Sequence, residues 1–512
     1  MNLNSRWITG IFLGLIMLVT IFTRIYKLDT VPPGLWPDEA LNGVQAIFEP
    51  YHLFYPENNG REGLIMALDA ISFKFLGISM FAFRLVPAIL GILTVLGVFF
   101  VAYELFRKKN LALLAAFFTA TSFWHINFSR INFRAIMLPL ILCWSFYFLL
   151  MGMRKKNWWP FAASGMVFGI GFYTYSSFRL APFILLAVIA VWWLASRKEK
   201  ARGRFFGQAS LMLLATFFTA LPIGLYFLNG RMDEFYGRLG PISVFSLSSP
   251  VNAIIDSTWR HLVMFNIYGD PNWRHNFAGD PQLFLPVGIM FLIGIYLLFK
   301  NGIGFLKTRD WRGLAPYATL SAWFGVMLLP GILTYEGLPH ALRVIGTIPA
   351  CYILAALGGV FAYDRLKTKI EDKNVLAVTV VAFLLFAGIA PVYRYFGQWA
   401  QSPRTIESFS SDLVAVGNYL KANAGGYDKY VVMYGGDLPA KTIQFVSLTA
   451  PGNENTQYIW PGSVRDIATN NPAYVIFMNR DQEAFDILKN KYPDGDLKIE
   501  PKTGVWVYYF NQ

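Results

Sequence analysis

Long apolar segments dominate this sequence, and they constrain its fold more than any other feature. A helix needs roughly 20 predominantly apolar residues to cross the hydrocarbon core of a bilayer. About eleven segments come near this length, at Trp7–Tyr26, Phe81–Phe106, Leu111–Asn127, Phe133–Met153, Pro160–Ser176, Arg179–Ala195, Phe206–Leu228, Leu283–Phe299, Leu314–Leu333, Ala341–Tyr363 and Val375–Tyr395. Inside lipid, a single segment satisfies its own backbone hydrogen bonds only as a helix. The sequence therefore predicts an α-helical polytopic membrane protein.

Charge is sparse and follows the loops. The 512 residues are 55% hydrophobic and 15% charged, with a formal net charge of +13. Lys and Arg cluster in alternate loops, at Arg107–Lys109, Arg154–Lys156, Arg197–Arg204, Lys300–Arg312 and Arg365–Lys373. The positive-inside rule makes these loops cytoplasmic, which predicts N-in/C-out topology in the cell (inner) membrane. The charge thus reports topology, and no nucleic-acid partner is expected.

The first outer loop, residues 28–80, carries two adjacent carboxylates, Asp38 and Glu39, directly after Pro37. Proline at a first helical position and acids in a first turn predict a short helix running to about Phe48. A second, weakly amphipathic stretch at Leu64–Leu76 predicts a helix along the membrane interface. The two acids can serve as residues of a helix start. A carboxylate held at the outer surface can also act as a base on a substrate that lipid delivers.

A second long outer loop, residues 229–281, ends in a stretch rich in turn formers, aromatics and polar groups that includes Asp270 and Arg274. It fits a lid or acceptor groove, and it equally fits a solvated connector. His261 and His275 show no recognisable metal-ligand spacing, so a structural role is expected for both. The two cysteines, Cys143 and Cys351, lie inside apolar runs, which predicts no disulfide framework.

Arginines recur at the outer ends of expected spans, where the positive-inside bias would not place them. They are Arg130, Arg134, Arg179 and Arg343, the last of which follows His340 closely. The planar guanidinium suits phosphate oxygens, although a single arginine can also extend to lipid headgroups. Several together, opposite a carboxylate loop, favour a site for a lipid phosphate.

Short motifs carry a family resemblance. The first outer loop joins Asp-Glu after Pro to Gly60-Arg61-Glu62-Gly63-Leu64, and Phe83-Arg84-Leu85-Val86-Pro87 and His340–Gly346 follow. Over roughly Trp7 to Tyr363 the chain resembles bacterial relatives of protein O-mannosyltransferases and lipid A aminoarabinose transferases. These are GT-C fold glycosyltransferases that use polyprenyl-phosphate sugars.

The resemblance implies a catalytic role for Asp38, with Glu39 as its neighbour, and donor-phosphate contact for Arg61. Some members have a second Asp near the start of the fourth span, where this chain reads Ala135–Pro139 without an acid. Glu62 is an alternative second carboxylate, and with the Asp-Glu pair it could bind a divalent ion. No metal or cofactor is required by the resemblance, and none is expected.

The implied reaction is an inverting displacement. Arg61 and Arg343, together with Arg134, would hold the phosphate of a polyprenyl-phosphate sugar, while Asp38 deprotonates an extracytoplasmic acceptor. Residues Glu62, Arg130, Arg179, His340, Asp270 and Arg274 are possible accessory residues. The expected partners are this donor, the acceptor and membrane lipid.

The C-terminal segment is more polar and contains no span. Residues 1–396 are expected to form the membrane domain and residues 397–512 a small extracytoplasmic α/β domain. Its expected elements are helices at Asp412–Ala422 and Asp481–Lys489 and strands at Tyr430–Tyr434, Tyr474–Met478 and Val505–Phe510. Only Gly435-Gly436 follows the first strand, so nucleotide binding is not expected. The domain could dock an acceptor or simply cap the outer loops.

A polytopic transporter or lipid flippase would share this composition and is the alternative. Transporters usually place ionisable groups near the middle of their spans. The acids of this chain gather instead in the outer loops, which favours an interfacial enzyme.

Overall fold

The computed structural model of the protein describes residues 6–49, 51–196, 202–237, 239–500 and 504–511. Part of the basic cluster expected at Arg197–Arg204 therefore lies outside the described residues. The chain forms two compact units. Unit one comprises Met1–Tyr26, His52–Ile65 and Pro87–Trp399, and unit two comprises Lys27–Tyr51, Met66–Val86 and Ala400–Gln512. Unit two thus contains parts of the first outer loop as well as the C-terminal segment. The sequence prediction placed a single boundary at residue 396 and assigned the whole first outer loop to the membrane domain.

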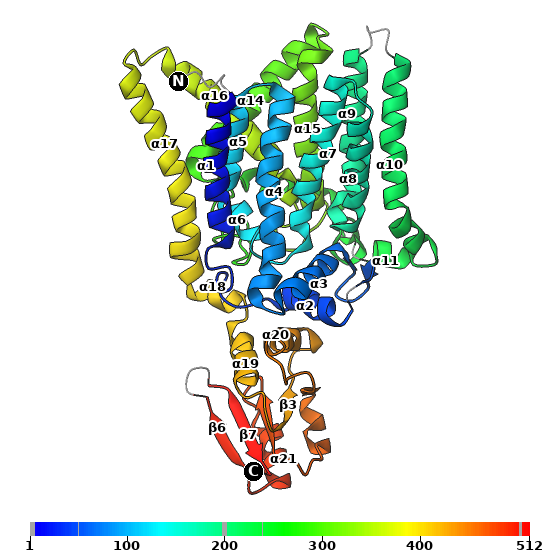
Figure 1. The fold of residues 1–512 in the computed structure, drawn as a ribbon, viewed down its shortest axis with the longest axis vertical. Helices are drawn as coiled ribbons and strands as arrows, with labels where there is room; N and C mark the ends of the chain where they lie inside the picture. The colour runs from blue at the N-terminus through cyan, green and yellow to red at the C-terminus, as the bar shows by residue number, and fades with distance from the viewer. Residues whose placement is uncertain (1–5, 50, 197–201, 238, 501–503, 512) are drawn as a thin grey trace. The chain divides into compact units, whose positions relative to one another are not determined.

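Unit one is a bundle of helices that run side by side (Figure 1). Its long helices are α1 (Arg6–Ile25), α4 (Met80–Phe106, which starts in unit two), α5 (Lys109–Thr121), α7 (Met137–Lys155), α8 (Trp159–Ile170), α9 (Ala181–Ser196), α10 (Arg202–Leu228), α13 (Pro250–Val263), α14 (Leu285–Lys307), α15 (Trp311–Ile332), α16 (Ile348–Lys367) and α17 (Lys373–Tyr393). Its short elements are β1 (Phe54–Tyr55), β2 (Arg61–Glu62), α6 (Phe123–Phe128), η1 (Arg134–Ile136), η2 (Gly171–Tyr173), η3 (Ser176–Leu180), α11 (Met232–Tyr236), α12 (Leu239–Ile242), η4 (Val244–Ser246), η5 (Ile345–Thr347), η6 (Arg394–Gln398) and η7 (Trp399–Gln401, which ends in unit two).

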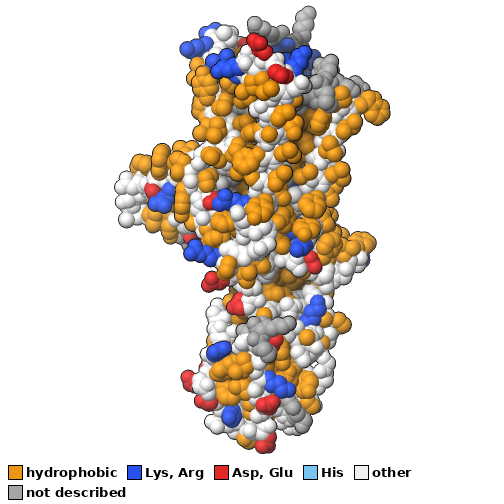
Figure 2. Space-filling model, turned by 90° about the vertical axis from the view of Figure 1, so that its left-hand side faces the viewer, with side chains coloured by type: hydrophobic (Ala, Val, Ile, Leu, Met, Phe, Trp, Pro, Cys, Tyr) orange, Lys and Arg blue, Asp and Glu red, His pale blue; other side chains and the backbone are white. Residues whose placement is uncertain are grey.

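Among the described residues, nine helices are long and apolar enough to cross a membrane, and each overlaps an expected span. The other two expected spans correspond to α5 and α8, which have 13 and 12 residues. The first of these breaks at Ser122, whose side chain accepts the backbone N–H of His125 and starts the separate helix α6. Figure 2 shows the broad hydrophobic surface that the bundle presents, as expected for helices facing lipid.

The basic loops of unit one gather at one end of its helices. Arg154, at the end of α7, forms a bidentate pair with Glu104 near the end of α4, at 2.7 and 2.8 Å. Arg204, at the start of α10, donates to the backbone oxygen of Lys156. Figure 1 shows the α14–α15 and α16–α17 connections at the same end. This arrangement matches the expected alternation of basic and non-basic loops.

Unit two joins helices from both ends of the chain to one sheet. Its elements are α2 (Pro37–Phe48), most of α3 (Leu64–Leu76), α18 (Pro403–Ser408), α19 (Ser411–Ala422), β3 (Asp428–Val432), α20 (Asp437–Ser447), β4 (Gln457–Ile459), η8 (Pro461–Asp466), β5 (Ala473–Phe477), α21 (Gln482–Lys491), β6 (Asp496–Ile499) and β7 (Trp506–Phe510). The strand order is β4-β3-β5-β7-β6, with β3 parallel to β4 and β5, and β7 antiparallel to β5 and β6.

The expected elements of this domain match α19, β3, β5, α21 and β7 within a few residues. The sequence did not predict α20, which follows Gly435-Gly436 and contains Pro439, or the short strands β4 and β6. In the first outer loop, α2 and α3 have the expected bounds, with Pro37 at the start of α2.

Candidate active site

The two carboxylates at the start of α2 have different environments. Glu39 is fully buried, and its Oε1 lies 3.5 Å from Nε of Arg84, which is also fully buried. Arg84 further donates to the backbone oxygens of Pro32 and Gly34 at 2.9 and 2.5 Å. The guanidinium therefore ties the incoming loop to the helix, and Glu39 balances its charge.

Asp38 is the accessible member of the pair. Its side chain is only partly buried, and Oδ2 accepts the indole N–H of Trp36 at 3.1 Å. It lies in the first turn of α2, near the positive end of the helix dipole. Of the two acids, Asp38 is the one that can meet a substrate.

Helix α20 packs against α2 within unit two. Thr442 donates its hydroxyl to the backbone oxygen of Leu35 at 3.1 Å, just before α2 begins. The rings of Phe445 and Phe83 lie 4.8 Å apart, and a Cβ on Gly43 would come within 2.5 Å of the Phe445 ring. The helix that carries Asp38 is thus held from one side by a helix some 400 residues later.

Unit one contains a group of three arginines and one glutamate, largely buried, which we call the arginine cluster: Arg61, Glu62, Arg134 and Arg179. Glu62 Oε2 accepts Nε of Arg134 at 2.8 Å, and Glu62 Oε1 accepts Nη2 of Arg179 at 3.3 Å. Arg61, the neighbour of Glu62 in β2, is 2% exposed and donates Nε to the backbone oxygen of Glu57 at 3.3 Å. Two guanidiniums thus pair with one carboxylate, and Arg61 is next to Glu62 in the chain.

The charge state of the arginine cluster follows from its contacts. Burial opposes ionisation of Glu62, but the guanidiniums of Arg134 and Arg179 outweigh it and lower the pKa of that carboxyl below 4.5. At neutral pH the cluster therefore carries one negative and three positive charges. The excess positive charge suits a phosphate monoanion or diester.

Arg343 contacts η3 through its backbone oxygen. The hydroxyl of Ser177, in η3 with Arg179, donates to the backbone oxygen of Arg343 at 3.4 Å. The Arg343 guanidinium donates to Thr334 Oγ1 at 2.9 Å and to Glu336 Oε2 at 3.1 Å. Glu336 is 66% exposed on its side chain, so a stronger anionic ligand could replace it.

Arg130 contacts the end of helix α1. It donates to the backbone oxygens of Thr23, Arg24 and Tyr26 at 3.0, 2.9 and 2.7 Å. These carbonyls at and just beyond the end of α1 would otherwise lack helical partners. The guanidinium, a possible accessory residue of the site, thus caps α1.

The outer loop around Asp270 is held by polar contacts. Arg274 donates Nε to Asn272 Oδ1 at 3.3 Å, and its backbone oxygen accepts from Asn127 at 2.7 Å. His261 accepts the backbone N–H of His340 on Nε2 at 3.2 Å. Much of the preceding loop is helical, in α11, α12 and α13. In the described part of the chain, one group of side chains could hold a metal ion: Asp270, His275 and His340.

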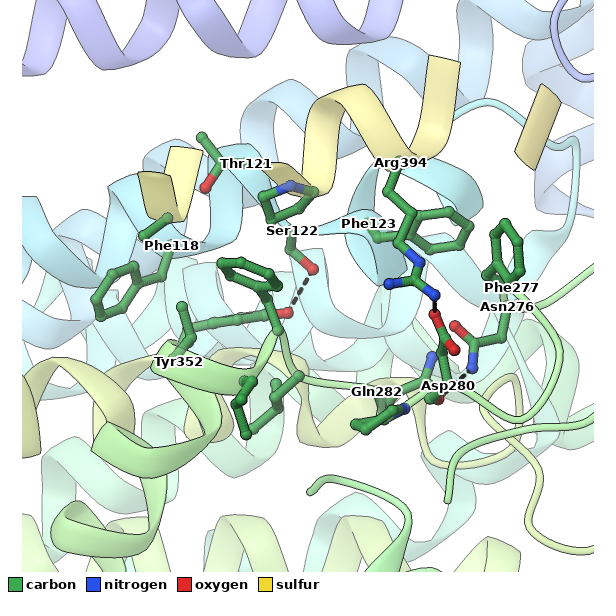
Figure 3. A pocket seen from close by; sticks show the side chains of 17 residues that line it. Phe118, Thr121, Ser122, Phe123, Asn276, Phe277, Asp280, Gln282, Tyr352 and Arg394 are labelled. Atoms are coloured by element: carbon green, nitrogen blue, oxygen red, sulfur yellow. Dashed lines mark hydrogen bonds and ion pairs between the residues drawn. The ribbon is translucent and has the colours of Figure 1, made fainter. Parts of the chain in front are cut away.

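A cavity of about 160 Å³ lies between α5, α6, α14, α16 and α17, beside the end of the same outer loop (Figure 3). Its wall is partly apolar, and Arg394 pairs with Asp280 at its edge. Ser122 and Tyr352 form a hydroxyl pair there, and both amide atoms of Gln282 are buried without a hydrogen-bond partner among the described residues. The cavity thus offers donors and acceptors next to an apolar surface.

The sites expected from the sequence separate into two groups. Arg61, Glu62, Arg134 and Arg179 come together in unit one, with Arg343 on the adjacent segment. Asp38 and Glu39 belong to unit two. Sequence reasoning did not identify Arg84 as the partner of Glu39, although Arg84 lies in a motif that carries the family resemblance.

Comparison with known proteins agrees with this architecture. Residues 64–223 match the family model described as dolichyl-phosphate-mannose-protein mannosyltransferase. A search of curated proteins found no match. Among solved structures, apo ArnT from Cupriavidus metallidurans is similar with a TM-score of 0.59 at 13% identity, over 98% of this chain and 97% of that one.

Two further structures are similar. ArnT from the same organism bound to undecaprenyl phosphate has a TM-score of 0.54 at 13% identity, over 99% and 98% of the two chains. The apo oligosaccharyltransferase of Archaeoglobus fulgidus has a TM-score of 0.53 at 16% identity, over 88% of this chain, which spans 65% of the length of that protein. These matches confirm the resemblance and the GT-C membrane fold expected from the sequence, and they support the expected enzyme class, a glycosyltransferase.

Proposed function

We propose that the protein transfers a sugar from a polyprenyl-phosphate donor to an acceptor at the non-cytoplasmic face of the cell membrane, with Asp38 as general base. The observation that carries the proposal is the arginine cluster in a GT-C fold: two guanidiniums pair with the Glu62 carboxylate, and the cluster holds one arginine more, Arg61. ArnT, a protein with a similar fold, has a crystal structure with bound undecaprenyl phosphate. Nucleotide sugars are absent outside the cytoplasm, so a donor used there must arrive on lipid.

The positive-inside rule supports this orientation. The end of unit one that carries the basic loops would face the cytoplasm. The first outer loop, which contains Asp38, Arg61 and Glu62, would then face outward.

The proposed reaction is a single displacement. The acceptor hydroxyl or amine forms a bond to the anomeric carbon while the bond from that carbon to the phosphate oxygen breaks. Asp38 takes the acceptor proton, the polyprenyl phosphate leaves with the electron pair, and the anomeric configuration inverts. Arg61, Arg134, Arg179 and Arg343 stabilise the charge that grows on the departing phosphate.

Glu39 has a different role in this proposal. Because its carboxylate is buried against Arg84, it positions α2 and does not act as the base. Glu62, the alternative second carboxylate, likewise holds arginines in place.

The alternative, a transporter or flippase, predicts ionisable groups at mid-membrane. Arg24, Arg84 and Glu104 are buried, but each lies near the end of its helix. This distribution favours the interfacial enzyme.

Asp38→Asn tests the proposal. The variant keeps the side chain's size and its capacity to accept from Trp36 but lacks the proton acceptor, so transfer should fall by roughly a hundredfold or more. Binding of undecaprenyl phosphate, measured on the purified protein, should change little. The matched control is Asp29→Asn, an exposed carboxylate in the same loop, which should transfer at the parent rate. A folded Asp38→Asn protein that also transfers at the parent rate would refute the assignment of the base.

Arg61→Ala tests the phosphate site. A charge-assisted contact to phosphate contributes roughly 1.5 to 3 kcal/mol, so undecaprenyl phosphate should bind about tenfold to a hundredfold more weakly. If Arg61→Ala bound undecaprenyl phosphate as tightly as the parent, the arginine cluster would not be the donor-phosphate site. The alternative function, a transporter or flippase, would then still be possible.

A further inference from the structure

Three potential metal ligands from two separate loops converge in unit one. His275 Nδ1 lies 2.9 Å from Asp270 Oδ2, and His340 Nδ1 lies 4.0 Å from the same oxygen. One ligand atom from each side chain lies within 4.8 Å of the other two. Asp270 and His275 are 1% and 4% exposed.

Both carboxylate oxygens of Asp270 accept hydrogen bonds, whereas Nδ1 of His340 has no hydrogen-bond partner among the described residues. The carboxylate of Asp270 accepts the backbone N–H groups of Asn272 and Ala341 at 2.8 and 2.7 Å, which fixes its orientation. His340 Nδ1 faces this carboxylate at a distance too long for a hydrogen bond, and it is buried without a hydrogen-bond partner in the described part of the chain. Leaving such an atom unsatisfied costs free energy. A cation between the three side chains would complete its contacts.

We propose that Asp270, His275 and His340 bind a divalent transition-metal ion of the zinc class. Two imidazoles and one carboxylate form a known zinc donor set, with bond lengths of about 2.0 to 2.2 Å and room for a fourth ligand. Ligand atoms bonded to one such ion lie roughly 3 to 4 Å apart, so only small rotations of the rings are needed. Two nitrogen donors disfavour magnesium and calcium, which prefer oxygen.

The local charges are compatible with a cation. The three ligand atoms lie within 4.8 Å of one another, and one of the three side chains is a carboxylate that can balance part of the charge of a cation. The charge of Arg343 is countered by Glu336 at 3.1 Å. Asp270 itself supplies one negative charge to the ion.

The proposed metal would fasten the outer loop at Asp270–His275 to the segment that leads into Arg343. This inference does not depend on sugar transfer, because it rests on the ligand geometry alone. The sequence did not predict the site because His340 lies far along the chain from the other two ligands.

The test uses the full-length protein purified in detergent, freed of metal, and titrated with Zn²⁺ against a competing chelator. We expect one tight equivalent per chain and a visible absorption spectrum of tetrahedral type when Co²⁺ is the probe. His340→Gln and Asp270→Asn should each weaken Zn²⁺ binding by at least about tenfold. The matched control is His52→Gln, an exposed histidine in another outer loop, which should bind as the parent does.

Two results would overturn the proposal. One is the absence of a tight equivalent in the unaltered protein, a measurement that needs no variant to fold. The other is equal Zn²⁺ affinity in His340→Gln and His52→Gln, which would place the ion elsewhere. Either result would leave the proposed sugar transfer untouched, since Asp38→Asn and Arg61→Ala test it separately.

Discussion

Arg84 pairs with Glu39 rather than with Asp38, although the two acids are adjacent: Nε of Arg84 lies 3.5 Å from Oε1 of Glu39, and both side chains are fully buried. The pair joins positions 45 residues apart. Glu39 therefore stabilises the fold through this pair, whereas the carboxylate of Asp38 remains accessible.

Glu39→Gln should destabilise unit two. The variant leaves the Arg84 guanidinium buried without its counter-charge, which typically costs about 3 to 5 kcal/mol. Thermal unfolding of the purified protein should show a lower midpoint, whereas Asp38→Asn should unfold like the parent. If Glu39→Gln proved as stable as Asp38→Asn, the buried pair would not contribute as described.

The stability of the folded protein should decrease in acid when Glu62 of the arginine cluster becomes protonated. Its pKa in the folded protein is lowered from 4.5, so its ionic contribution is fully present above 4.5 and is lost as the pH falls through the lower folded value. Glu62→Gln should therefore be less stable than the parent at neutral pH, with a difference that shrinks in acid. Unfolding midpoints measured from neutral pH downward check this, and a difference independent of pH would contradict it.

Arg130 and Arg61 should respond oppositely to substitution. Arg130→Gln removes a guanidinium that donates to three carbonyls at the end of α1, so it should lower the unfolding midpoint and leave undecaprenyl phosphate binding intact. Arg61→Gln should weaken that binding with a smaller effect on unfolding. Loss of binding at an unchanged midpoint in Arg130→Gln would instead assign Arg130 to the phosphate site.

Truncation after Gln398 should affect the two units differently. The arginine cluster lies wholly in unit one, so the truncated protein should insert and still bind undecaprenyl phosphate. Helix α2, however, loses its contacts with α20 at Thr442 and Phe445. We expect the first outer loop to become sensitive to added protease and transfer to be lost. A truncated protein with full transfer would show that α20 is dispensable.

Orientation can be measured with single cysteines in a background that lacks Cys143 and Cys351. Cysteines at Asn59, Asn272 and Glu454, the exposed neighbour of the buried Asn453, should react with an impermeant thiol reagent in intact cells, and one at Lys156 should not. Labelling at Lys156 would reverse the proposed topology.

Local patterns predicted much of the fold. Pro37 followed by two acids was enough to place the start of α2, and continuous apolar runs located the long helices. The prediction fails where short elements depend on their neighbours. Helix α5 stops at Ser122, and α20 directly follows Gly435-Gly436, a pair typical of a turn.

The partners within the candidate site could not be predicted in the same way. Glu62 was singled out only because it follows Arg61, yet its contacts are with Arg134 and Arg179, 72 and 117 residues away. The sequence separation of such residues carries no signal, because their approach depends on how the helices pack. The same reason explains why Asp270 and His340 were considered separately.

The packing of α20 on α2 also has a consequence for biosynthesis. Helix α2 leaves the ribosome early, but Thr442 and Phe445, which pack on it and on its lead-in, are made only after the long membrane helices. Insertion into the bilayer and completion of the loop that carries Asp38 are therefore separate events in time. A nascent chain halted before α20 would be anchored in the membrane with this loop unfinished, so the protein would gain its activity only near the end of translation.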